Sequence, residues 1–452
     1  MIETSSHLTH KLRTMLKVTT PILITQVAMY LITFFDILMS SRYGSVDLAG
    51  VAVGSSIWMP VYTGLSGILV GITPIVAHLN GAKNKQEIKR MVQQGIYVAL
   101  LLSIVISFLL FLVSPIIISK MPIEEAVSHV SLRYIQSLLI GIVPLFVYSV
   151  LRSYMDGLGM TRITMFITLL SAPINVFFNY LFIFGNWGFP ELGGIGAGVA
   201  SAITYWIVLG ISMYVIHTKQ PFLSYYLFTH WSKIQLKKWK EILSIGVPIG
   251  LSIFAETSIF AAVTLLMSTY STAVISAHQI ALNFTSLLYM VPLSISFGAT
   301  VLIGNELGAN NVAGAKTYSR LAVSSAIVFS GLSAAILYFY REPISTIYTS
   351  DQEVIPITIQ FFLYAALFQL SDAIQAPVQG ALRGYKDVNV TFIMAIISYW
   401  VIGLPVGYYF ANFTNYGPFG YWIGLIAGLT IGAITLSVRL HRIQRKKEKM
   451  IS

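Results

Sequence analysis

The chain has 452 residues, of which 56% are hydrophobic and 10% are charged, and its mean hydropathy is +0.76. This composition excludes a water-soluble globular protein and indicates an integral membrane protein. The formal net charge of +11 does not indicate nucleic-acid binding, because the basic residues are dispersed among short loops. Cysteine is absent, which excludes disulfides and thiolate metal sites.

Apolar segments long enough to cross a bilayer recur along the whole chain. The twelve expected spans are 15–40, 49–79, 91–114, 131–151, 161–185, 195–217, 242–268, 274–304, 317–340, 357–382, 388–411 and 418–438. The segment before the first span lacks the apolar core and cleavage site of a secretory signal peptide, so we expect the N-terminus to be retained. The sequence therefore predicts an all-α integral membrane protein with twelve transmembrane helices.

Lysine and arginine are distributed unequally between the two sides of this topology. One side carries 24 of the 28, and the other carries only Arg42, Lys120, Arg133 and Arg341. The positive-inside rule assigns the basic side to the cytoplasm. We therefore expect a multi-pass protein of the cell membrane with both termini in the cytoplasm.

The chain contains an internal repeat. The segment GITPIVAHLNGAKN, which begins at Gly71, resembles GATVLIGNELGANN, which begins at Gly298, an offset of 227 residues (298 − 71 = 227). The same offset aligns two further pairs, Pro21 with Pro248 and Gly157 with Gly384. A match in three separated regions indicates a duplication. The two prolines are expected to open equivalent helices.

Each copy of the repeat has an even number of crossings, so both copies enter the membrane from the same side. They are therefore predicted to be two six-helix bundles, parallel repeats related by a pseudo-two-fold axis along the membrane normal, with a substrate cavity between them that opens alternately. The expected division is an N-lobe at 1–217, a cytoplasmic linker at 218–241, a C-lobe at 242–440 and a basic cytoplasmic tail at 441–452.

Three acids, Asp36, Glu256 and Asp372, interrupt the apolar spans, and we expect no lysine or arginine at comparable depth. A charge held in hydrocarbon costs at least ~2.5 kcal/mol, so intramembrane acids usually bind or relay a cation. The acids do not follow the repeat, because the offset pairs them with Val263, Met29 and Leu145 respectively. They are therefore predicted to be specialised cation-binding or coupling residues of one lobe each.

The LGAN segment that ends span 8, the LRGYKD segment after span 10, the two six-span lobes and the three acids together resemble the multidrug and toxic compound extrusion (MATE) family, in particular its NorM-like branch. The resemblance covers nearly the whole chain. It implies antiport of amphipathic, mostly cationic drugs against Na⁺ or H⁺. It also implies that Glu256 and Asp372 form a C-lobe site for Na⁺, and that Asp36 with Asn175 and Asn179 forms an N-lobe site.

Other polar residues are weaker candidates. Asn175 and Asn179 share one helix face, but interhelical hydrogen bonding would also explain them. His278 fits a satisfied histidine better than a proton relay. Possible cavity residues, which could equally be packing contacts, are Gln279, Asn283, Tyr289, Gln369 and Gln375. For Asp36, the structural alternative is a protonated acid bonded to a neighbouring helix.

The sequence also bears on functions other than antiport. The sequence has no Gly-Lys dipeptide and hence no Walker A loop, so it predicts neither an ATP-driven pump nor an enzyme, and no cofactor is expected beyond the coupling ion. The main alternative is a flippase for lipid-linked oligosaccharides or other lipids, for which a cavity rich in arginine would be expected. The sequence gives no evident buried arginine. We also expect the protein to be monomeric.

Overall fold

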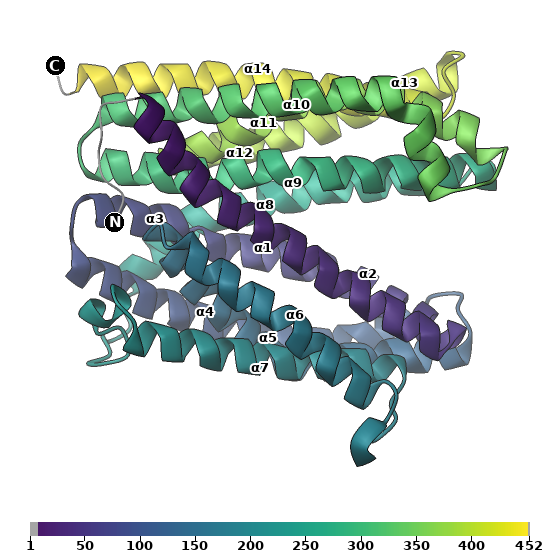
Figure 1. Ribbon diagram of the computed structural model, residues 1–452, viewed down its shortest axis with the longest axis horizontal. Coiled ribbons are helices and arrows are strands. Elements are labelled where there is room, and N and C mark those ends of the chain that lie inside the picture. The colour runs from purple at the N-terminus through teal and green to yellow at the C-terminus, as the bar shows by residue number, and fades with distance from the viewer. Residues whose placement is uncertain (1–7, 451–452) are drawn as a thin grey trace. The chain divides into compact units, whose positions relative to one another are not determined.

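The computed structural model describes residues 8–450, and this part of the chain is helical throughout, with no strand. Figure 1 shows the helices as long rods joined by short loops. The α-helices are α1 Leu8–Tyr43, α2 Ser45–Val70, α3 Ile72–Gly81, α4 Lys85–Ser119, α5 Glu125–Gly157, α6 Thr161–Phe182, α7 Gly194–Thr218, α8 Leu236–Met267, α9 Thr272–Gly308, α10 Val312–Tyr348, α11 Val354–Gly384, α12 Asn389–Ala395, α13 Leu404–Phe413 and α14 Phe419–Lys449. Short 3₁₀ turns lie at Asn186–Gly188 (η1) and Phe222–Tyr225 (η2), and a π-helix lies at Ile396–Gly403 (η3).

Within the described residues, twelve helices are long and apolar enough to cross a membrane, which confirms the predicted number of spans. Two of the spans are interrupted. Helices α2 and α3 together form the second span, and η3 separates α12 from α13 in the eleventh. The chain is therefore a multi-pass membrane protein.

The prediction that Pro21 and Pro248 open their helices is wrong. Helix α1 begins at Leu8 and helix α8 at Leu236, so both prolines lie inside long helices. The turns that precede them are polar, and a search for apolar runs therefore misses them. The tail expected from residue 441 is likewise helical, because α14 continues to Lys449.

Gly71, which lies between α2 and α3, makes a close packing contact. A Cβ on Gly71 would lie 2.6 Å from the Cα atom of Gly246 in α8, so only glycine allows the two backbones to approach so closely. On the other copy, a Cβ on Gly298 would meet Thr19 Oγ1 at 2.6 Å. Thr19 and Gly246 are themselves related by the 227-residue offset (246 − 19 = 227). Equivalent residues therefore pack against each other in both copies of the repeat, through backbone at Gly71 and through the threonine side chain at Gly298.

The repeat is also preserved where helices begin. Asn84 accepts a hydrogen bond from the backbone N–H of Glu87 and caps α4, while Asn311 accepts one from Gly314 and caps α10. The residues just before these caps, Lys83 and Asn310, both adopt left-handed backbone with φ of 57° and 59°. The structure thus reproduces the sequence repeat in its turns and caps.

By their internal contacts the helices form two compact units, and each unit takes part of a helix from the other half of the sequence. Within the described residues, unit 1 comprises 8–23 and 251–450, and unit 2 comprises 24–250. The boundaries therefore fall inside α1 and α8, two residues beyond Pro21 and Pro248. The early part of α1 is integral to unit 1, since Met15, Val18 and Ile22 belong to its buried core.

Unit 1 also buries an ion pair. Lys11 Nζ lies 3.0 Å from Glu306 Oε1, with side-chain exposures of 5% and 1%, and also lies over the ring of Tyr318. Unit 2 has the matching pair, Lys238 of α8 with Glu87 of α4. Lys11 and Lys238 are related by the same offset of 227 residues.

The linker before α8 is fixed within unit 2 by two adjacent glutamines of α4. Gln93 Nε2 donates to the carbonyl of Leu227, and Gln94 Nε2 donates to the carbonyl of Lys233. The amide oxygens accept from Ser232 and Gln235 backbone N–H groups in return. Buried side chains thus replace the backbone partners that an irregular segment lacks.

Candidate cation and substrate sites

Asp36 of α1 lies among polar side chains from α6 and α7 of unit 2. Asn179 Nδ2 donates to Asp36 Oδ1 at 2.6 Å and also to Asn175 Oδ1 at 3.1 Å. Ser201 of α7 completes the ring, since it accepts from Asn175 at 3.4 Å and donates to Asp36 Oδ2 at 3.5 Å. Asn175, Asn179 and Ser201 therefore surround a carboxylate whose two oxygens each accept a hydrogen bond.

Sequence reasoning brought Asp36 together with Asn175 and Asn179 but missed Ser201. It also missed two tyrosines, Tyr134 and Tyr205, that lie close enough to Asp36 for electrostatic interaction. A serine in the glycine-rich start of α7 carries no distinctive spacing. Only the fold reveals that these residues surround the acid.

Glu256 of α8 is bonded to helix α11 in unit 1. Gln379 Nε2 donates to Glu256 Oε1 at 2.6 Å. The residue before the acid, Ala255, accepts a hydrogen bond from Trp400 Nε1 at 3.2 Å. Trp400 lies in the π-helix η3, and π-helical turns are frequent at functional sites.

Asp372 lies on α11 two turns before Gln379 and is only 6% exposed. None of the described residues donates a hydrogen bond or forms an ion pair with it, but its charge interacts with that of Glu256. The hydroxyls of Tyr289 and Tyr399 interact electrostatically with both acids. Glu256 and Asp372 therefore belong to one polar cluster rather than to separate regions of the unit.

Helix α11 presents a buried polar stripe on this side. Its members recur every three or four residues and are all at most 6% exposed: Gln369, Asp372, Gln375, Gln379 and Arg383. The spacing was visible in the sequence, yet Gln379 and Arg383 were not selected. The side-chain oxygens of Gln369 and Gln375 are buried and accept no hydrogen bond from the described residues.

The remaining candidates are dispersed. Gln279 and Asn283 are exposed on α9, and Asn283 accepts a hydrogen bond from Tyr348 at 3.0 Å. His278 is fully buried, accepts from Trp422 Nε1 at 3.0 Å and contacts Thr264 Oγ1 at 3.2 Å. This agrees with a satisfied structural histidine.

The expectation that no arginine lies near the acids is wrong. Arg383 is 4% exposed, lies over the ring of Phe297 at 5.6 Å and interacts electrostatically with Glu256. It was overlooked because the sequence placed it in the loop after span 10, whereas α11 extends to Gly384. A single arginine beside two acids does not make the arginine-rich site expected of a phosphate-binding flippase.

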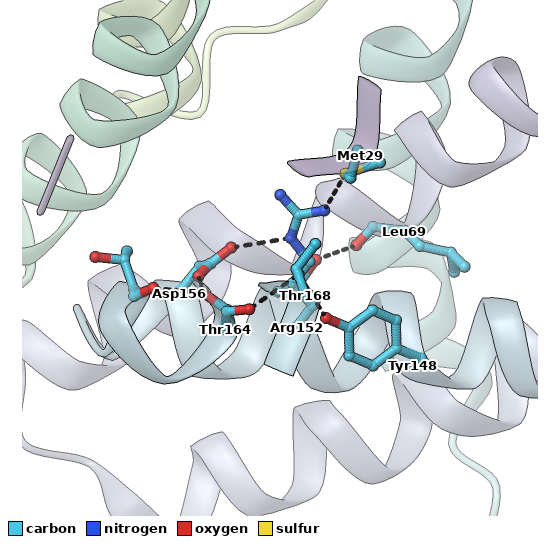
Figure 2. Close-up of polar contacts among 9 residues, drawn as sticks. Met29, Leu69, Tyr148, Arg152, Asp156, Thr164 and Thr168 are labelled. Carbon is cyan, nitrogen blue, oxygen red and sulfur yellow. Dashed lines mark hydrogen bonds and ion pairs between the residues drawn. The ribbon is translucent and has the colours of Figure 1, made fainter. Parts of the chain in front are cut away.

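Unit 2 has its own partly buried arginine in α5 (Figure 2). Arg152 Nε lies 3.6 Å from Asp156 Oδ2, one helical turn away, and Arg152 Nη1 contacts Met29 Sδ at 3.3 Å. Thr164 Oγ1 donates to the other carboxylate oxygen of Asp156 at 2.7 Å. This arginine is therefore neutralised within its own helix.

The acids of unit 1 supply only part of the ligands that a metal ion needs. Across residues 8–450, no three His, Cys, Asp or Glu side chains gather closely enough to hold a metal ion. A hard cation between Glu256 and Asp372 would therefore take its remaining oxygen ligands from neutral groups. The unpaired amide oxygens of Gln369 and Gln375 are of the right chemical type.

A helical membrane protein built from two repeated halves, with a buried acid cluster in each, has the architecture of a secondary transporter. A family model described as MatE matches residues 21–181 and 248–409, one segment in each half. The chain therefore belongs to the MATE family of multidrug efflux transporters, and it is not an enzyme.

Individual relatives agree with this assignment. The chain is 52% identical to a probable multidrug resistance protein NorM of Halalkalibacterium halodurans, over 95% of this chain and 94% of that protein. It is 52% identical to the Bacillus subtilis protein of the same name, over 96% of both. The structure superposes on a mutant of a Vibrio cholerae MATE transporter with a TM-score of 0.88 at 18% identity, covering 97% of this chain and 98% of that one.

Proposed function

We propose that the protein exports amphipathic organic cations from the cytoplasm in exchange for an inward-moving cation, by alternating access. In this proposal Na⁺ binds in unit 1 between Glu256 and Asp372, and Asp36 of unit 2 binds either a proton or the cationic drug. The observation that carries it is the pair of interacting acids in unit 1. Two like charges in a buried cluster need a cationic partner to be stable together.

Several neighbouring groups support these roles. The orphan amide oxygens on α11 suit a hard cation, and the exposed Gln279 and Asn283 with Tyr289 are proposed to contact drug or ion from α9. Around Asp36, Asn175 and Asn179 are proposed to hold the carboxylate in place while proton and drug exchange. The drug-like substrates of the NorM relatives are proposed for this chain as well.

The proposal also includes the membrane location, the topology and the oligomeric state of the transporter. The 24 to 4 distribution of basic residues supports a location in the cell membrane with both termini in the cytoplasm. Each unit is compact by its own internal contacts, which supports action as a monomer. One charge moved down the membrane potential supplies ~2.3 kcal/mol per 100 mV, enough to drive appreciable accumulation.

Proteoliposomes loaded with ethidium test the proposal directly. An imposed Na⁺ or H⁺ gradient should drive ethidium across the membrane, and the two gradients are applied separately to identify the coupling ion. The Glu256→Gln variant is the matched control and should lose the Na⁺-driven component. Ethidium movement that is independent of both gradients would contradict antiport.

A further inference from the structure

Arg383 belongs to the buried polar stripe of α11. Among the described residues, no acid is in contact with its side chain. Its side chain is 4% exposed, and its Nη1 atom is buried with no hydrogen-bond partner. Contact with the ring of Phe297 compensates only part of its charge. A buried guanidinium with an unused donor is costly, so its position calls for a partner at another stage of the transport cycle.

Glu256 is the nearest candidate for that partner. It is held by Gln379, one turn before Arg383 on the same face of α11. The charges of Arg383 and Glu256 interact through the protein interior, although the two side chains are not in contact. An arginine side chain has several rotatable bonds, so a change of rotamer would bring its donors to the carboxylate that Gln379 already contacts.

Unit 2 distributes charge differently over the positions that match by the 227-residue offset. The 227-residue offset converts Met29, Arg152 and Asp156 into Glu256, Gln379 and Arg383. In unit 2 the arginine contacts the methionine and pairs with the aspartate of its own helix (Figure 2). In unit 1 the arginine occupies the position of that aspartate, and the acid faces it from the other helix. Unit 2 therefore holds an ion pair within one helix, whereas unit 1 holds an arginine and an acid that lie on different helices and are not in contact.

We propose that Arg383 is an internal counter-ion for Glu256, which competes with the transported cation and so sets the affinity and release rate of the cation site. In the proposed cation-bound state, the guanidinium keeps its position over the ring of Phe297. When the cation leaves, the guanidinium pairs with Glu256 and neutralises it. Arg383 is a positioning residue and does not touch the cation. This inference rests on the proposed cation site at Glu256 and Asp372.

Binding of radioactive Na⁺ to purified protein in lipid nanodiscs measures the affinity. Arg383→Gln should bind Na⁺ about tenfold more tightly than the parent, because a nearby positive charge that opposes cation binding has been removed. It should also release bound Na⁺ more slowly after dilution. Arg383→Met, which keeps a long apolar stem, should behave like the Gln variant and replaces it if the Gln variant folds poorly.

Two controls separate charge from packing. Arg383→Lys keeps the positive charge and should retain an affinity close to that of the parent. The double variant Arg152→Gln/Asp156→Asn removes the matching arginine of unit 2 with its partner and should leave Na⁺ affinity unchanged. Unchanged or weaker Na⁺ binding in both neutral variants, or identical behaviour of the Lys and Gln variants, would overturn the counter-ion role.

The same assay distinguishes this inference from the proposed function. Glu256→Gln should abolish saturable Na⁺ binding. If the parent binds no Na⁺, or if Glu256→Gln binds it as the parent does, the cation site itself is wrong and the counter-ion role fails with it. If Glu256→Gln loses binding while Arg383→Gln and Arg383→Met leave affinity and release rate unchanged, only the role of Arg383 is overturned.

Discussion

The two units place different chemistry on equivalent backbone positions. Unit 2 neutralises Arg152 with Asp156 within a single helix, whereas unit 1 separates Arg383 from Glu256, which lies on a different helix. Their caps, turns and close glycine contacts are nevertheless shared. At these positions the two units therefore differ in the placement of charge on a shared backbone framework.

A second contrast concerns the helices that face the acids. In unit 2, α6 is a continuous α-helix that presents Asn175 and Asn179 to Asp36. The equivalent stretch of unit 1 contains the π-helix η3, which supplies Tyr399 and Trp400 instead. Glycines on α14 allow the wider turn, since a Cβ on Gly428 would lie 2.2 Å from the Ser398 carbonyl oxygen. The two copies of the repeat therefore present different side chains to their acids.

The largest expected difference between the units comes from neutralising the acids of unit 1. Glu256→Gln and Asp372→Asn should each abolish Na⁺-driven efflux, because neither acid alone holds the ion well. The double variant should be no worse than either single variant, so the losses are strongly non-additive. Na⁺ binding and ethidium efflux measure this. Independent, additive losses would assign the two acids to different sites.

Asp36 provides the corresponding test in unit 2. Acidification protonates Asp36 and removes the negative charge that holds a cationic drug, so drug affinity of the parent should fall as pH falls. Asp36→Asn mimics the protonated acid in size and should bind drug weakly at every pH, with Na⁺ binding in unit 1 retained. Fluorescence titration with ethidium across a pH series checks this. A variant that still releases drug on acidification would place the proton elsewhere.

Matched glycine substitutions test whether the repeat is structurally equivalent. A Cβ on Gly157 would lie 2.8 Å from Val76, and one on Gly384 would lie 2.9 Å from Ile303. Alanine at either position should therefore lower the free energy of unfolding by a similar amount, about 1–3 kcal/mol. Thermal unfolding of both variants in nanodiscs measures the loss. A large difference between them would show that the two copies pack differently here.

The smallest expected effect concerns the helix caps. Asn84→Ala should destabilise α4 by about 1 kcal/mol through loss of its N-cap bond. Asn311→Ala should cost more, because Asn311 Nδ2 also donates to Glu306 Oε2 at 2.6 Å, beside the Lys11 ion pair. The same unfolding measurement ranks the two variants. Equal losses would mean that the additional bond contributes nothing measurable.

Much of the fold follows from the sequence because its signals are long. Twelve apolar runs and a repeat visible at Gly71 and Gly298 were predictable from spacing and hydropathy, whereas the neighbourhood of Asp36 and Asn179 followed from the family resemblance. The polar first turns of α1 and α8 were missed because they carry no apolar signal. The burial of Arg383 was missed for a related reason, since charge beside a glycine is typical of a loop.

The ligands contributed by other helices could not be predicted. Ser201 reaches Asp36 from a residue 165 positions away, and Trp400 reaches the residue before Glu256 across 145 positions. Such contacts depend on how distant helices pack together, and the residues around each position do not reveal that packing. Nor does composition reveal that η3 is a π-helix, since its residues resemble those of any apolar span.

The division of α1 and α8 between units means that the two halves of the chain are not separable parts. A fragment cut before residue 236 would lack Gly246, against which Gly71 packs in unit 2. The complementary fragment would lack Lys11, Met15 and Val18, which complete the ion pair and core of unit 1. Each half therefore depends on the other for a finished interior, as in a domain-swapped dimer whose subunits have been joined into one polypeptide.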